Sequence, residues 1–140
     1  METRLFALGV CSPRDQLRAR QRARQIAGLL GFEACQQAAL AAEVFAWLRA
    51  GRHSVSTRIA FVVVDRSLKV ELGARRLSAP LPDKLPHAVE DVGWMIRELD
   101  RQAPFVIMEE VDAQNRELLA VADSQPLRNV PGLRVNESAA

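Results

Sequence analysis

The feature that most constrains this chain is an abrupt change in the spacing of its apolar residues. Between residues 13 and 50 they recur every three or four positions, as in amphipathic helices. From Val55 to Val63 side chains alternate between two faces instead, and a second alternating run, Leu68–Leu72, follows the polar turn Asp65–Ser67. We predict an α+β fold: a small, mostly antiparallel sheet with helices packed on one face, plus a C-terminal helical arm.

Local signals set the limits of the first elements. Residues 3–10, TRLFALGV, are apolar enough for an opening strand. Ser12 and Pro13 are typical of a helix start, and Gly31 supplies a left-handed stop, which predicts a helix from Pro13 to about Leu30. A second helix is predicted from Glu33 to Ala50, ended by Gly51 and covered on two sides.

Beyond the alternating runs, the sequence predicts a connector and two further helices. Residues 77–86, LSAPLPDKLP, hold three prolines and indicate a connector. A third helix follows from about Leu85 and carries Trp94 on its polar side, so Trp94 is a candidate for either a partner contact or a contact with the next helix or the tail. A fourth, from Pro104 to Ala122, has alternating three- and four-residue spacings that indicate a short coiled-coil seam. The predicted seam and interface residues are Met108, Val111, Asn115 and Leu118.

These predictions divide the chain into residues 1–80, a truncated α+β domain, residues 81–123, a helical pair or dimerisation arm, and residues 124–140, a flexible tail. Asn115 in the seam is either a buried amide that fixes the register of a dimer or an exposed residue of a helix packed on its own domain. We favour the homodimer.

Composition limits the class of function. The 140 residues include 19 basic and 17 acidic ones, a net charge of +2, so nucleic acid is a disfavoured partner. Five arginines between Arg14 and Arg24 are scattered by helical spacing, and we expect them to form a solvated face. The two cysteines and two histidines have no zinc-ligand spacing, so we expect no metal and no cofactor. No apolar run is long enough to span a membrane and no leader is evident, so we expect a cytoplasmic protein.

Residues 19–51, ARQRARQIAGLLGFEACQQAALAAEVFAWLRAG, resemble the start of ATP-binding domains in the anti-sigma-factor serine kinase branch of the GHKL superfamily. In that family an arginine- and alanine-rich helix, an LGF turn and a helix with the motif E-x-x-x-N follow an N-terminal strand. Glu43 matches the glutamate, and Trp47 stands where the family has the asparagine.

The resemblance continues downstream. KVELG, residues 69–73, looks like the last strand of such a domain. Residues 99–124, LDRQAPFVIMEEVDAQNRELLAVADS, look like the start of the signalling coiled coil that follows it in sensor kinases and phosphatases. The family's D-x-G-x-G strand end and glycine-rich lid are both missing, because no glycine follows Asp65 until Gly73.

The resemblance therefore implies a degenerate GHKL-type domain. Glu43 and Trp47 are relics of a magnesium and nucleotide site, Trp47 fills part of the vacated cavity, and no catalytic residue is expected, since an indole offers magnesium no oxygen ligand. We expect a non-catalytic regulatory or scaffold module of a bacterial signalling circuit. Its expected partners are a second copy and a kinase, a phosphatase or an anti-sigma antagonist. The alternative is an ATP-dependent kinase that binds ATP and Mg²⁺, for which the Glu43 match is the local support.

Overall fold

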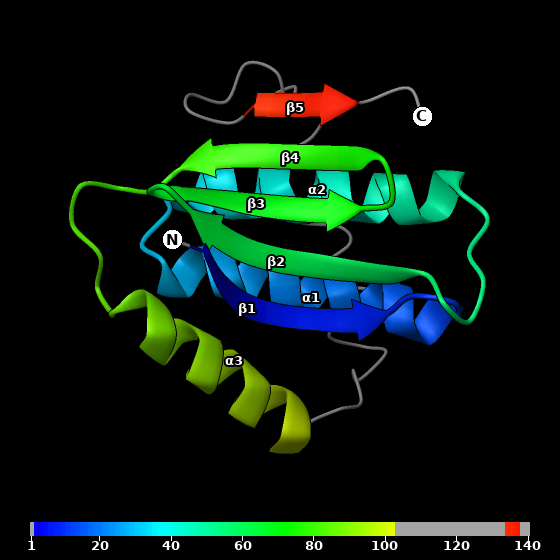
Figure 1. The fold of residues 1–140 in the computed structure, drawn as a ribbon, viewed down its shortest axis with the longest axis horizontal. Coiled ribbons are helices and arrows are strands. Elements are labelled where there is room, and N and C mark those ends of the chain that lie inside the picture. The colour runs from blue at the N-terminus through cyan, green and yellow to red at the C-terminus, as the bar shows by residue number, and fades with distance from the viewer. Residues whose placement is uncertain (1, 103–133, 138–140) are drawn as a thin grey trace.

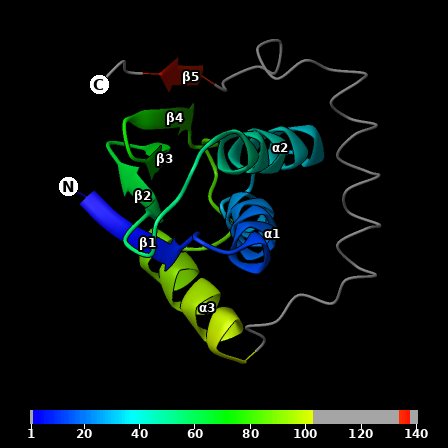
Figure 2. The same cartoon turned by 90° about the vertical axis from the view of Figure 1, so that its right-hand side faces the viewer.

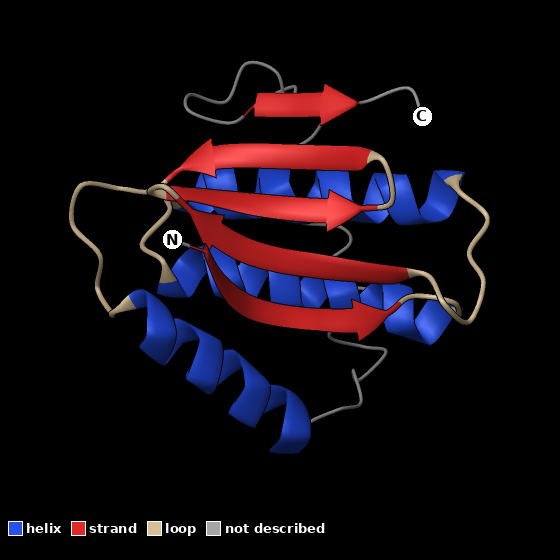
Figure 3. Ribbon diagram, in the orientation of Figure 1, coloured by secondary structure: helices blue, strands red, loops and turns tan. Residues whose placement is uncertain are grey.

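An antiparallel sheet covered on one face by two helices forms the centre of this computed structural model, which describes residues 2–102 and 134–137 (Figures 1 and 3). The strands lie in the order β1-β2-β3-β4-β5, so each strand pairs with the strand that comes next along the chain. The elements are β1 (Glu2–Gly9), α1 (Pro13–Leu29), α2 (Ala34–Ala50), β2 (Arg58–Val64), β3 (Ser67–Leu72), β4 (Arg75–Pro80), α3 (Val89–Gln102) and β5 (Arg134–Glu137). The predicted fold class is confirmed.

The two layers are clearest in Figure 2, where α1 and α2 lie side by side against one face of the sheet and α3 runs along the outer side of β1. Phe61, Val70 and Leu77, from three adjacent strands, are fully buried in the core that faces the two helices. Val92 and Ile96 of α3 are also fully buried in this core. The helix α3 therefore packs on the same core as the elements before it.

The sequence signals for α1 and α2 are confirmed. The Ser12 hydroxyl accepts a hydrogen bond from the backbone N–H of Asp15 at 3.1 Å, and Pro13 begins the helix. Gly31 takes a φ of +89°, the left-handed conformation expected after a helix end. At the start of α2 the backbone N–H of Glu33 donates to the Gln36 side chain at 3.1 Å.

The strands β2 and β3 form an antiparallel hairpin around the polar turn that the sequence indicates. Asp65 and Arg66 make the turn with φ values of 50° and 64°, so both central residues are left-handed, as in a two-residue type I′ turn. This geometry is uncommon for residues other than glycine, asparagine and aspartate, which is why the turn DRS is a weak hairpin signal.

The prediction of a connector over residues 77–86 is wrong in its first part. Residues 77–80 belong to β4, where Leu77 and Ala79 are buried and Ser78 points to the other face. Pro80 is the last residue of the strand, and the remaining prolines, Pro82 and Pro86, come after it. A proline at a strand end removes no hydrogen bond from the middle of the strand pairing. The number of prolines in residues 77–86 therefore does not exclude a strand over residues 77–80.

The helix and tail boundaries also differ from expectation. The third helix begins at Val89, so Leu85 lies in the loop before it. Residues 134–137, within the tail expected to be flexible, form β5 and pair with β4, with Val135 opposite Leu77. The predicted fourth helix and its residues Met108, Val111, Asn115 and Leu118 lie outside the described residues.

Candidate functional site

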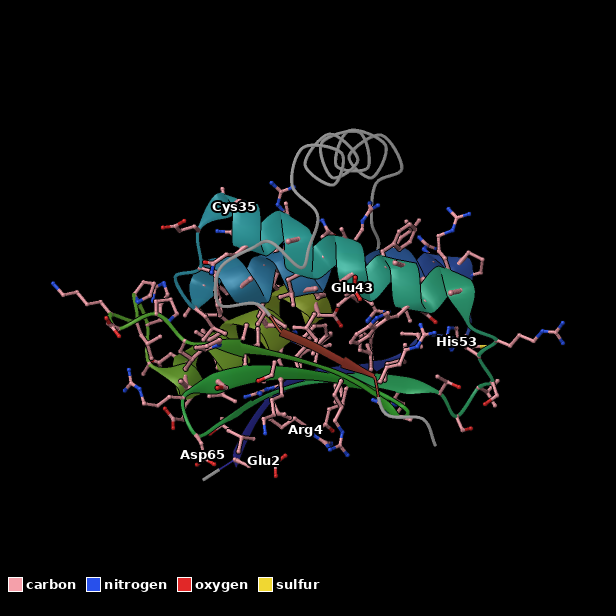
Figure 4. The ribbon with its side chains drawn as sticks, turned by 90° about the horizontal axis from the view of Figure 1, so that it is seen from above. Glu2, Arg4, Cys35, Glu43, His53 and Asp65 are labelled. Atoms are coloured by element: carbon pink, nitrogen blue, oxygen red, sulfur yellow. The ribbon has the colours of Figure 1, made fainter. Side chains whose placement is uncertain are left out.

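Glu43 and Trp47 are one helical turn apart on α2, and their side chains contact each other. The Trp47 indole Nε1 donates a hydrogen bond to Glu43 Oε1 at 2.9 Å. Trp47 is only 3% exposed and packs in the core, whereas Glu43 is half-buried at the middle of the helix (Figure 4). The buried indole thus satisfies its only polar group with the Glu43 carboxylate.

This arrangement limits what the pair can do chemically. The Trp47 indole gives the Glu43 carboxylate a hydrogen-bond donor, and an indole has no oxygen to offer a cation. Asp65, the other carboxylate of interest, lies in the exposed β2–β3 turn, and Figure 4 shows it at the end of the sheet, well apart from Glu43. The fold therefore does not bring the two carboxylates into one site.

Phe45 lies on the opposite side of α2 from Glu43 and Trp47, and two arginine guanidinium groups lie over its ring. The Arg20 guanidinium carbon lies 4.8 Å from the ring centroid and that of Arg49 lies 5.6 Å from it, both within cation–π range. Burial, together with the nearby charge of Arg24, lowers the pKa of Arg20 below its ordinary value. Arg20 therefore belongs to the helix interface rather than to solvent.

The arginines of α1 do not form the expected solvated face. Arg20 and Arg22 are 1% and 2% exposed, and Arg22 donates through Nε to Asp100 of α3 at 3.0 Å. Arg18 also donates to Asp100, from Nε at 3.1 Å and from Nη2 at 2.7 Å. Helical periodicity alone placed these side chains in water, but α3 packs over them and supplies the carboxylate.

Asp100 is consequently the charged residue that fastens α3 to α1. Burial acts to raise its pKa, but the hydrogen bonds and charges of Arg18 and Arg22 prevail, so the pKa of Asp100 lies below its ordinary value. The carboxylate stays ionised at neutral pH and holds both guanidinium groups. The sequence alone does not predict this cluster, because no local pattern links Asp100 to Arg22, which is 78 positions away, or to Arg18, which is 82 positions away.

A second contact closes the edge of the sheet. The pairing of β1 with β2 shifts register between Arg4 and Phe6, which leaves Leu5 as a bulge. Arg97 Nη1 donates to the Leu5 carbonyl oxygen at 3.2 Å, and Gly93 leaves room for this guanidinium group, since a Cβ there would lie 3.0 Å from Arg97 Nη1. The helix α3 thereby covers an edge strand that would otherwise offer free backbone groups.

Two surface hollows border α3, and neither is lined by Glu43 or Trp47. The larger, about 650 Å³, lies between α1, α2 and α3. It is lined by Arg24, Gln25, Gly28, Leu29, Gln37, Met95 and Leu99. The smaller, about 380 Å³, lies between β1 and the end of α3.

The remaining candidate residues are dispersed. His53 lies in the loop after α2, where its Nε2 is 2.9 Å from the Leu48 carbonyl oxygen, and Cys35 lies at the opposite end of that helix (Figure 4). Cys11 is exposed and Cys35 is half-buried. Residues 2–102 and 134–137 contain no group of three histidine, cysteine or acidic side chains placed to hold a metal ion.

Trp94 is where the sequence placed it, on the polar side of α3, and it is 61% exposed. None of the described helices is both long and apolar enough to cross a membrane. The chain matches no protein-family profile, no curated protein and no solved structure.

Proposed function

We propose that this chain is a non-catalytic regulatory or scaffold module of a bacterial signalling or stress-response circuit, derived from a GHKL-type ATP-binding domain. It acts in the cytoplasm through protein contacts. Its partners are a second copy of the chain and a signalling protein, either a kinase, a phosphatase or an anti-sigma antagonist.

The observation that carries this proposal is the hydrogen bond between Trp47 and Glu43. In an active domain of that family the carboxylate would face a nucleotide and its magnesium ion. Here a large side chain that is 3% exposed fills the asparagine position, and its indole N–H occupies a carboxylate oxygen. Restoring a nucleotide site would require moving a buried aromatic out of the core, which is costly.

The connection between β2 and β3 supports the same proposal. A two-residue turn, Asp65 and Arg66, stands where the resemblance places the glycine-rich adenine motif. The strands β3 and β4 are in turn joined only through Gly73 and Ala74, so no segment between β2 and β4 is long enough for a phosphate lid.

Calorimetric titration with ATP and Mg²⁺ tests the proposal. We expect no saturable heat for the wild-type chain. The matched variant is Trp47→Asn, which restores the residue type of the resembling family at this position and should also bind no nucleotide, because the glycine motif and lid are missing. Saturable binding of ATP by the wild-type chain would overturn the scaffold proposal in favour of the alternative, an ATP-dependent kinase.

A further inference from the structure

The helix α3 carries an unusual second face. Its buried face, Val92, Gly93 and Ile96, packs on the core. On the other side lie four residues that are all exposed: Glu90, Trp94, Arg97 and Arg101. Their spacings of four, three and four positions place them in one stripe along the helix.

The stripe is complementary to itself. Its spacing reads the same in both directions, so an antiparallel copy of α3 brings Glu90 opposite Arg101 and Trp94 opposite Arg97, each pair twice. The first pair joins opposite charges, and the second places a guanidinium against an indole, which is the most favourable cation–π partner. A parallel arrangement would instead place Glu90 against Glu90 and Arg101 against Arg101.

The stripe is presented on a fixed and accessible element. The helix lies at the border of the molecule beyond β1 in two perpendicular views (Figures 1 and 2). Asp100 holds it to α1, and the hydrogen bond from Arg97 to the Leu5 carbonyl fixes that guanidinium group. Arg101 is held by Glu98 on the same helix while its side chain remains 71% exposed. These contacts reduce the entropy lost when the side chains are ordered at an interface.

From this geometry we infer that α3 is the contact surface for a second copy of this chain, with the two α3 helices antiparallel about a two-fold axis midway between Trp94 and Arg97. Such an interface is isologous, since each copy supplies the same four residues. The inference deepens the self-association in the proposed function and is independent of the seam predicted for residues 104–122. Because one pair of short helices buries less than a standard interface, the association should be weak and concentration-dependent.

A charge exchange tests the inference on the full-length chain by sedimentation velocity over a series of concentrations. In the Glu90→Arg variant, the new arginine at position 90 of each copy faces Arg101 of the other copy. In the Arg101→Glu variant, the new glutamate at position 101 faces Glu90 of the other copy. Each substitution therefore places like charges together twice and should weaken dimerisation at least about tenfold. The double variant restores opposite charges and should recover dimerisation. Circular dichroism melts check that the variants, all at exposed positions, remain folded.

Tryptophan emission gives a second readout. Trp47 is buried already, so a blue shift that grows with concentration reports Trp94, and Trp94→Ala should abolish both this shift and the dimer. A wild-type chain that remains a monomer would overturn the inference. A dimer that is insensitive to the charge exchange would overturn the α3 interface but not self-association itself. The ATP titration tests the proposed function independently of these sedimentation results.

Discussion

Arg22 Nε and Asp100 Oδ1 lie 3.0 Å apart, joining residues 78 positions distant in the sequence and tying α3 to α1. Asp100 also accepts two hydrogen bonds from Arg18, so one carboxylate neutralises two guanidinium groups at the helix interface. The orientation of α3, and with it the placement of Trp94, depends on this cluster.

Asp100→Asn should destabilise the fold at neutral pH by about 2 kcal/mol, because Arg18 and the nearly buried Arg22 lose the charge of this carboxylate. Urea unfolding at pH 7 measures the change. Glu98→Gln is the matched control, since it removes a carboxylate two positions away that contacts the exposed Arg101, and it should change the stability little. Equal effects of the two substitutions would contradict a structural role for the cluster.

The lowered pKa of Asp100 predicts a pH dependence with a definite sign. The carboxylate contributes stability at pH values above its unfolded pKa, and this contribution is lost as the pH falls through the still lower folded pKa. The stability gap between the wild-type chain and Asp100→Asn should therefore close on acidification below about pH 4. Urea unfolding of both chains from neutral to acidic pH tests this, and a gap that widens in acid would show the opposite linkage.

Trp47→Ala should destabilise the chain by about 3–4 kcal/mol, since it opens a cavity in the core and removes the hydrogen-bond donor of Glu43. Trp47→Phe keeps most of the volume, so a loss of about 1–2 kcal/mol is expected for it. Thermal and urea melts measure both. Trp94→Ala provides the contrast at a site that is 61% exposed, and a comparable loss there would contradict the assigned burial.

How far the sequence predicts this structure depends on the range of the interactions involved. Pro13 and Gly31 mark the ends of α1 through local capping, and the alternation of Leu68 to Leu72 identifies β3 without knowledge of its partners. The strand β4 was missed because a local proline signal outweighed a short alternating pattern that only pairing with β3 confirms.

The candidate site divides in the same way. Trp47 and Glu43 are four positions apart on a helix, so their proximity follows from the sequence, and so does the donor role of the indole N–H. The burial of Arg22 depends on α3 packing across α1, which no local pattern specifies. Arg97 likewise finds its acceptor, the Leu5 carbonyl, at a bulge that the alternation of β1 does not reveal.

The seam predicted for residues 104–122 provides a separate test of self-association. If Asn115 fixes the register of a dimer, Asn115→Leu should relax this choice and populate other oligomers, whereas Leu118→Glu should weaken the assembly. Light scattering on the full-length variants measures both. If both variants keep the mass of the wild-type chain, the predicted seam does not contribute to self-association. The α3 stripe would then be the remaining proposed contact surface.

The last prediction concerns the turn between α1 and α2. Gly31 has a φ of +89°, and a Cβ added there would lie 2.8 Å from Pro86 Cδ, so Gly31→Ala combines backbone strain with a clash against a rigid ring. Gly73 has a φ of +60° but nothing within 4 Å, so Gly73→Ala carries the backbone cost alone. We expect a loss of about 1 kcal/mol for Gly73→Ala and about 2–4 kcal/mol for Gly31→Ala in urea unfolding. Equal losses of stability for the two variants would mean that the loop before α3 moves to make room for the new Cβ. Pro86 would then not restrict the position of the α1–α2 turn.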